Sequence, residues 1–403
     1  MEVKFASITP KESESIAKES ENERGDCLVN FEELSRCLMK KLEEKETELM
    51  NCQIEKEVLL KKVDCLQKQM GKQSGIYVDF SDEGNKANCF QLQSVDKMNS
   101  LFHEMQKWLP EIPFQAKYSK SLLLDVFFFM FSTGMSSRDI SKTLLVNGLQ
   151  VSHQSIISWM DLTMENLAKW GQSTVKWPTP DQWLADSRRI QEASHYSDYA
   201  QKLFFFVDGT IIKTFDTSDI RISQKMRNSK HGSPGFVFFI MVTPAGRVVY
   251  VSELREGTCH DKTHFMSDGV VALLEKEYPK PSVTLNGIKY QLVLGGDKAY
   301  PFAPLPSGWH WYITKTGEGS MDVDSEGKEV GERASSQKLK NVIFDPGFAR
   351  LRSVVERTIG RIKGWAIFSS KHHLTSEQRV KWLILISIGL LNWDFEKGYL
   401  EKI

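Results

Sequence analysis

The chain has 403 residues, of which 41% are hydrophobic and 26% charged, and its 52 basic residues equal its 52 acidic residues in number. This ordinary composition excludes a wholly disordered chain. The zero net charge excludes a globally basic nucleic-acid-binding protein but leaves a locally basic one open. The length predicts two or three domains.

Cysteine spacing and apolar runs argue against further classes of protein. The six cysteines form no Cys-x-x-Cys pair, so the sequence predicts neither a zinc site nor a disulfide scaffold, and a reducing compartment is favoured. The first twenty residues contain no apolar stretch of the kind that signal peptides have. The longest aliphatic run, 382–393, is too short to span a membrane, so we expect no membrane association.

The N-terminal part of the chain is polar and then becomes periodic. Residues 1–33 are rich in Ser, Glu and Lys and are predicted to be disordered. Residues 34–72 carry a heptad pattern with Glu and Lys on its flanks, which predicts a coiled coil and a homo-oligomer. Apart from two lysines, the ten seam positions are apolar or Cys: Leu38, Leu42, Lys45, Leu49, Cys52, Lys56, Leu59, Val63, Leu66 and Met70. A single solvated charged helix is the alternative, and residues 73–117 read as a linker.

Three helices are predicted in close succession between 118 and 170. Ser119, Ser136 and Ser152 each precede an apolar periodic segment and can cap a helix, and Gly148 lies in the short turn before the third helix. This arrangement is typical of a helix-turn-helix, whose last helix enters the major groove by its first turn. A plain structural bundle fits the spacing equally well. The candidate base-reading residues are His153, Gln154, Ser155 and Ser158.

Strand-like segments follow a polar stretch, 171–200, that is predicted to be a second linker. Strands are expected at 203–215, 235–244, 247–254, 290–297 and 309–316, and helices at 263–278, 348–363 and 376–394. A polar insertion at 317–338 separates the last strand from the later helices. This order is typical of an α/β fold with a ribonuclease H-like mixed sheet flanked by helices, here predicted over 201–396.

Three carboxylates stand where such a sheet would gather them. Asp208 interrupts the first apolar strand, Asp297 ends the fourth strand, and Glu356 lies on the helix 348–363. Cleavage of a phosphodiester needs charge stabilisation on both the attacking and the leaving oxygen, and carboxylate-bound Mg²⁺ or Mn²⁺ supplies it. Each acid alone could equally be a salt-bridged or capping side chain, but the three together in this order favour a metal-dependent nuclease.

The segments that carry these acids resemble a known family. VDGT at 207–210, GDKAYP at 296–301 and RSVVERTIGRIKGW at 352–365 resemble the DDE superfamily of transposase endonucleases, in particular its eukaryotic Harbinger-like enzymes. GTCHDKTHF at 257–265 and LLNWDF at 390–395 are also similar to segments of that family. The predicted helix-turn-helix is similar to the one that precedes the catalytic domain there, so the resemblance covers about 118–396.

The resemblance implies an enzyme that cuts and joins DNA with Mg²⁺ or Mn²⁺. It implies that Asp208, Asp297 and Glu356 are the metal-binding catalytic acids. His260 and Asp261 are implied as accessory residues, although His260 can instead have a structural role and Asp261 can instead cap the helix that follows it. It further implies a nuclear protein that acts on element ends and target DNA, in some systems with a separate DNA-binding protein. The insertion at 317–338 and the lack of an N-terminal zinc finger depart from the family.

Basic residues gather around Glu356. The window 338–381 holds ten Lys and Arg against three acids, a net charge of +7. Arg357, Arg361 and Lys363 lie within two helical turns of Glu356 and are candidates for contacts with the DNA backbone. The alternative is that they form surface ion pairs. A second basic segment, 223–230, is a candidate DNA-contact hairpin.

Three functions are compatible with the sequence. The first is a transposase-derived, metal-dependent DNA endonuclease and strand transferase, which the intact set of acids favours. The second is a domesticated, non-catalytic helix-turn-helix regulator. The third, a coiled-coil adaptor, would explain only the N-terminal region.

Overall fold

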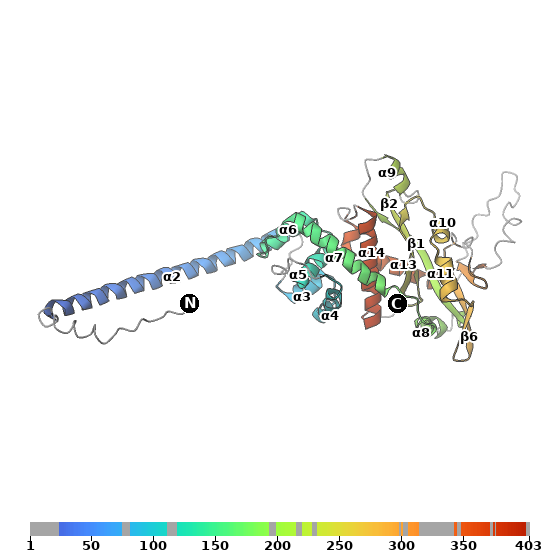
Figure 1. Cartoon of the computed structure of the whole chain (residues 1–403), viewed down its shortest axis with the longest axis horizontal. Helices are drawn as coiled ribbons and strands as arrows, with labels where there is room; N and C mark the ends of the chain where they lie inside the picture. Colours follow the sequence, from blue (N-terminus) through green and yellow to red (C-terminus); the bar gives the residue numbers. More distant parts are fainter. Residues whose placement is uncertain are drawn as a thin grey trace, which may run out of the picture. The chain divides into compact units, whose positions relative to one another are not determined.

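The computed structural model divides the chain into two compact units, residues 1–77 and 78–403 (Figure 1). The described residues are 24–74, 81–110, 119–192, 199–214, 220–227, 232–297, 300, 305–313, 342–344, 348–370, 374 and 376–399. The predicted disordered residues before Arg24 and the predicted insertion at 317–338 lie outside these ranges.

In the first unit, one helix, α2, runs from Arg24 to Ser74. It therefore begins ten residues before the predicted coiled coil. Side chains along its seam are exposed, among them Leu38, Leu42, Leu49 and Leu59, each between 59% and 64% accessible. A seam of exposed leucines is what one strand of a coiled coil presents to its partner.

In the second unit, the segment predicted as a linker at 73–117 contains two helices, α3 (Glu83–Cys89) and α4 (Val95–Gln106). Phe90 and Phe102 pack against Phe128, with ring centroids 5.9 and 5.2 Å from it. Lys97 forms an ion pair with Asp394 at 2.9 Å. The two short helices thus belong to the folded core. They were not predicted, because 7 and 12 residues carry too little periodic pattern.

The three predicted helices are present as α5 (Lys120–Thr133), α6 (Ser137–Val146) and α7 (His153–Thr174). Each begins after its predicted capping serine, and each serine hydroxyl accepts a hydrogen bond from a backbone N–H in the first turn. Gly134 ends α5 in the left-handed conformation, with φ of 68°, which glycine adopts without strain. Helix α5 is buried on all sides, which accounts for its run of Leu and Phe.

Helix α7 packs closely along α14 (Glu377–Lys397). The crossing point is formed by Gly171 and Gly389: a Cβ added to Gly171 would lie 2.1 Å from the backbone oxygen of Leu385. Asn392 fixes the end of this pair to the sheet, because its side-chain amide bonds both Val248 N and Val248 O, and Thr174 O as well. The predicted linker at 171–200 therefore contains the end of α7, and it also contains α8 (Pro180–Glu192).

The described strands form one mixed sheet in the order β3-β2-β1-β6-β7-β8, in which β4 pairs with β2 and β5 with β6. Strands β1, β2 and β3 are antiparallel, whereas β1, β6, β7 and β8 are parallel. This topology is compatible with the predicted ribonuclease H-like layer. The bounds are β1 Lys202–Lys213, β2 Gly235–Val242, β3 Val248–Val251, β4 Arg255–Glu256, β5 Ser282–Leu285, β6 Ile288–Gly296, β7 His310–Ile313 and β8 Val342–Phe344.

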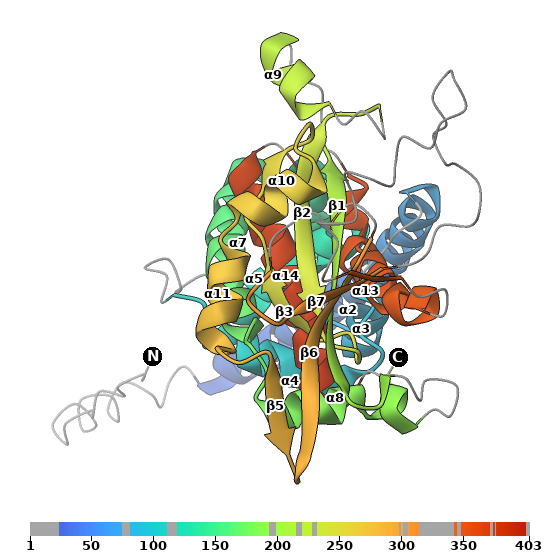
Figure 2. The same cartoon turned by 90° about the vertical axis from the view of Figure 1, so that its right-hand side faces the viewer.

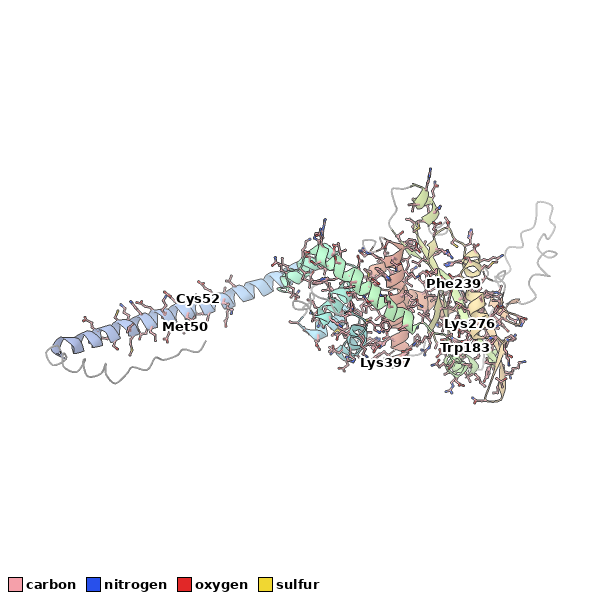
Figure 3. The ribbon with its side chains drawn as sticks, in the orientation of Figure 1. Met50, Cys52, Trp183, Phe239, Lys276 and Lys397 are labelled. Carbon is pink, nitrogen blue, oxygen red and sulfur yellow. The ribbon has the colours of Figure 1, made fainter. Side chains whose placement is uncertain are left out.

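Helices cover both faces of the central strand β1. On one face, Trp183 of α8 stacks on Phe205 at 3.8 Å and donates a hydrogen bond to Phe204 O. Trp183 belongs to one buried cluster with Phe239 of β2 (labelled in Figure 3). On the other face, Phe204 and Phe206 contact Phe348 at the start of α13 (Phe348–Lys363). Residues of β1 therefore alternate between two cores.

Several predictions of local structure were wrong in detail. The single helix expected at 263–278 is two helices, α10 (Asp261–Ser267) and α11 (Val270–Glu277), because Gly269 between them is left-handed, with φ of 76°. The basic segment expected as a hairpin begins with a helix, α9 (Ile220–Met226). Figure 2 shows α9 and the β5–β6 hairpin projecting at opposite ends of the sheet. A single turn of 3-10 helix, Ala366–Phe368, follows α13.

Candidate active site

Strands β1 and β6 bring two of the predicted acids to the same level. The strands are parallel, and their pairing ends where Phe206 lies opposite Gly295. Asp208 lies two residues after Phe206, and Asp297 lies two residues after Gly295. Because paired parallel strands advance together and lie about 5 Å apart, the register alone places these two residues side by side.

The third acid comes from α13, which packs against β1. Arg352 and Glu356 are one helical turn apart on α13. Arg352 donates from Nη1 to Asp208 Oδ2 at 3.2 Å and from Nη2 to Glu356 Oε1. One guanidinium therefore joins the acid of the strand to the acid of the helix.

The carboxyl of Asp208 is in an unusual electrostatic environment. Burial raises its pKa from 3.8 to about 6, and the charges of Asp297 and Glu356 push in the same direction. The Arg352 guanidinium and a hydrogen bond from Gly209 N, 2.9 Å from Oδ1, oppose this rise in the pKa. Such a shift is common at functional sites, where charge is held in a partly desolvated position.

The acids fit a hard divalent cation by their chemistry, although they are not arranged as a finished metal site. Within the described ranges, no three His, Cys, Asp or Glu side chains are grouped so that they could hold one ion. Arg352 forms ion pairs with both Asp208 and Glu356. The acids nevertheless offer only carboxylate oxygens, which Mg²⁺ and Mn²⁺ prefer. The Tyr300 hydroxyl is also buried near them and has no hydrogen-bond partner among the described residues.

Asp261 lies beside this group, on the other side of Gly209. A Cβ added to Gly209 would lie 2.6 Å from Asp261 Oδ1 and 3.3 Å from the Tyr300 hydroxyl. Burial raises the pKa of Tyr300 well above its usual value, and the charges of Asp261, Asp208 and Asp297 add to this effect. Asp261 is the first residue of α10, not its N-cap. The N-cap is His260, whose exposed side chain makes no capping bond.

The predicted base-reading residues lie on a different element from the acids. Gln154 and Ser158 are exposed in the first turns of α7, and His153 and Ser155 are half-buried there. Ser155 takes part in the helix cap, since its backbone N–H donates to Ser152 Oγ at 3.1 Å and its own Oγ lies 2.9 Å from that atom. Gln154 and Ser158 are therefore the more accessible pair.

The three basic residues predicted to contact the DNA backbone lie on α13, the helix that carries Glu356. Arg357 and Arg361 are exposed, and Arg357 donates to Ser353 Oγ at 2.6 Å. Lys363 is half-buried and donates to Thr210 Oγ1 at 3.1 Å. Burial lowers the pKa of Lys363, and the charge of Lys213 lowers it further. Thr210 shares a face of β1 with Asp208, so Lys363 lies along the same strand as the acid.

Sequence reasoning missed three residues of this site. Arg352 stands four residues before Glu356, a spacing that places the two on one face of a helix. Tyr300 stands three residues after Asp297, and Gly209 directly follows Asp208. The first spacing could have been noticed. The role of Gly209 could not, because it depends on Asp261 and Tyr300, which approach from far along the chain.

Comparison with known proteins identifies one family. A family model described as "DDE superfamily endonuclease" matches residues 207–392. That range includes Asp208, Asp297 and Glu356, and it excludes α2 and the whole of α7. Comparisons with curated proteins and with solved structures give no match.

Proposed function

We propose, from the match of residues 207–392 to the family model of DDE superfamily endonucleases, that the chain is a transposase-derived DNA endonuclease and strand transferase that depends on Mg²⁺ or Mn²⁺. Its catalytic acids are Asp208, Asp297 and Glu356. The observation that supports this most directly is that β1, β6 and α13 bring the three acids near one another. The charges of Asp297 and Glu356 both raise the pKa of Asp208.

The proposed chemistry follows from the positions of these side chains. When bound, two divalent ions stabilise the charge on the attacking and leaving oxygens of the phosphodiester. Asp208 would hold such an ion by its carboxylate oxygens, for which the ion and a proton compete, so binding should weaken as the pH falls below the pKa of about 6. Arg357, Arg361 and Lys363 then bind the neighbouring phosphates, because all three extend from the helix that carries Glu356.

DNA recognition is assigned to two further surfaces. The exposed first turns of α7, with Gln154 and Ser158, suit the reading of base edges as in a helix-turn-helix. Helix α9 projects from the sheet and exposes Arg221 and Lys225, which suits contacts with phosphate. Action on DNA implies a nuclear protein, and a separate DNA-binding partner is compatible with this scheme. Among the described helices, none is both long and apolar enough to cross a membrane.

We further propose that α2 pairs with α2 of a second copy in a parallel coiled coil. Its seam is exposed from Leu38 to Leu59, and the lysines within the seam have acidic neighbours: Lys45 is followed by Glu46, and Lys56 is preceded by Glu55. In a parallel pair these acids flank the partner's lysines. Two copies suit an enzyme that has to hold two DNA ends.

Cysteine cross-linking tests this pairing. Cys52 occupies a predicted seam position and extends from α2 near Met50 (Figure 3), whereas Cys37 falls outside the predicted seam positions. In a parallel, in-register pair, two Cys52 residues come within disulfide distance and two Cys37 residues do not. We expect a chain that retains only Cys52 to form a disulfide-linked dimer on mild oxidation at least about tenfold faster than a chain that retains only Cys37. Equal rates, or a monomer at micromolar concentration in sedimentation, would contradict the pairing.

Plasmid nicking tests the proposed activity. We expect the full chain to nick supercoiled DNA with Mg²⁺ or Mn²⁺ and to stop when EDTA is added. Asp297→Ala, purified in the same way, controls for contaminating nucleases. Nicking that persists in EDTA or in this variant would refute the assignment. Binding of Mn²⁺ without nicking of any DNA would point to a required partner or end sequence, and absence of both would favour a non-catalytic regulator.

A further inference from the structure

Arg352 makes a contact that the proposed chemistry does not explain. Its guanidinium bonds Asp208 and Glu356, so two of the three catalytic acids are engaged by the chain's own cation. The contact is partly shielded from water, because the Arg352 side chain is 17% exposed and that of Asp208 is 20% exposed. The Nε atom of Arg352 is buried and has no partner among the described residues, so the guanidinium is held from its two Nη atoms.

Electrostatics explain why a cation lies there. Carboxylates gathered in a partly buried site repel one another, and here Asp297 and Glu356 both disfavour ionisation of Asp208. A guanidinium stays charged at all ordinary pH values and can donate to two carboxylates at once. Arg352 thus supplies the compensation that a divalent ion would otherwise provide.

We propose that Arg352 is a positioning residue that takes the place of a divalent ion: it holds Asp208 to Glu356 while no ion is bound, and it leaves them when one binds. This inference rests on the proposed function, since it assumes that the two acids bind the ion. The same oxygens cannot accept from the guanidinium and coordinate a metal at full strength. Ion binding and the Arg352 contact therefore compete.

Competition has two consequences of opposite sign. Removing the guanidinium exposes the acids to their mutual repulsion, so the ion-free protein becomes less stable. Removing it also frees the acids, so an ion binds more tightly. A merely structural arginine would behave differently, because its loss would lower stability equally with and without the ion and would leave the affinity for the ion unchanged.

The test is Arg352→Gln in the full chain, with Mn²⁺ as the probe. We expect calorimetric titration to give an affinity for Mn²⁺ about tenfold higher than that of the wild type. We also expect thermal unfolding to show a lower Tm in EDTA and a larger rise in Tm on adding Mn²⁺. The matched control is Arg379→Gln, which removes a 2.6 Å ion pair to Asp161 outside the site and should leave the affinity for Mn²⁺ unchanged.

An unchanged or weaker affinity for Mn²⁺ in Arg352→Gln would overturn the inference. If that variant does not fold, Arg352→Lys replaces it. Lysine keeps the charge but cannot donate to two carboxylates as the planar guanidinium does. The affinity of Arg352→Lys for Mn²⁺ should therefore lie above that of the wild type. An affinity of Arg352→Lys equal to or below that of the wild type would likewise overturn it. Failure of the proposed function is distinguishable, because the wild type itself would then bind no Mn²⁺.

Discussion

Replacing Asp208 by asparagine is expected to abolish metal-dependent nicking and, at the same time, to stabilise the ion-free protein. The loss of nicking should be about 1,000-fold or more, since the substitution removes one of the acids that act together. Asparagine keeps the shape of the protonated side chain, so the fold around β1 should persist. Loss of activity together with a gain in stability separates a catalytic role from simple misfolding.

The sign of the stability change follows from the pKa of Asp208. In the folded chain the pKa is raised to about 6, whereas in the unfolded chain it is near 3.8. Between these values the folded state binds more protons than the unfolded state, so the stability of the wild type falls as the pH rises from about 4 to 6. The cost that remains above pH 6 is about 2–3 kcal/mol, and asparagine removes it.

Urea unfolding in EDTA at pH 5 and pH 7.5 measures this effect. We expect the variant to exceed the wild type by about 2 kcal/mol at pH 7.5 and by less at pH 5. Asp186→Asn is the control, since it removes an Asp–Arg pair outside the site and should retain nicking. An Asp208→Asn variant that still nicks, or that is less stable than the wild type at pH 7.5, would contradict the assignment of this acid.

The second large effect is expected at Gly171, where α7 crosses α14. An alanine Cβ there would lie 2.1 Å from Leu385 O and 2.6 Å from Leu385 C. Both are backbone atoms of a helix and cannot rotate away, so the two helices would have to separate along their shared surface. We expect Gly171→Ala to lower the free energy of unfolding by about 3 kcal/mol or more, measured by urea denaturation.

Gly360 is the matched control for this prediction. It too lies inside a helix, α13, but a Cβ added to it would meet nothing within 4 Å. Because alanine favours helix more than glycine does, Gly360→Ala should raise stability by about 0.5–1 kcal/mol. A Gly171→Ala variant as stable as the wild type would show that the crossing of α7 and α14 is looser than described.

Local signals predicted much of the fold. The capping serines Ser119, Ser136 and Ser152 were found because an N-cap is readable from a few neighbouring residues, and α13 has the predicted bounds, Phe348–Lys363. Strand β5 was missed although Asn286-Gly287, both with positive φ, is a strong hairpin signal. Strand β8 was also not predicted, because three residues carry too little pattern.

The site was predictable where one strand's own sequence carried the information. Asp208 interrupts one apolar strand and Asp297 ends another, and the register of the two parallel strands places them next to each other. The contacts of Arg352 and Tyr300 depend on how α13 and the segment after β6 dock on β1. Such docking is set by side chains far apart in sequence, so no local pattern indicates it. The pairing of α2 and the base-reading role of α7 remain predictions.

Helix α7 has a consequence for the choice of cleavage position. Its 22 residues span about 33 Å, close to one turn of duplex DNA, and its far end is tied through Asn392 to strand β3. For an enzyme that reads bases with the first turn of α7, the spacing between recognised sequence and cut bond is then fixed by a rigid rod. One additional base pair between them would turn the scissile phosphate by about 35° around the duplex axis, away from the acids that should receive it.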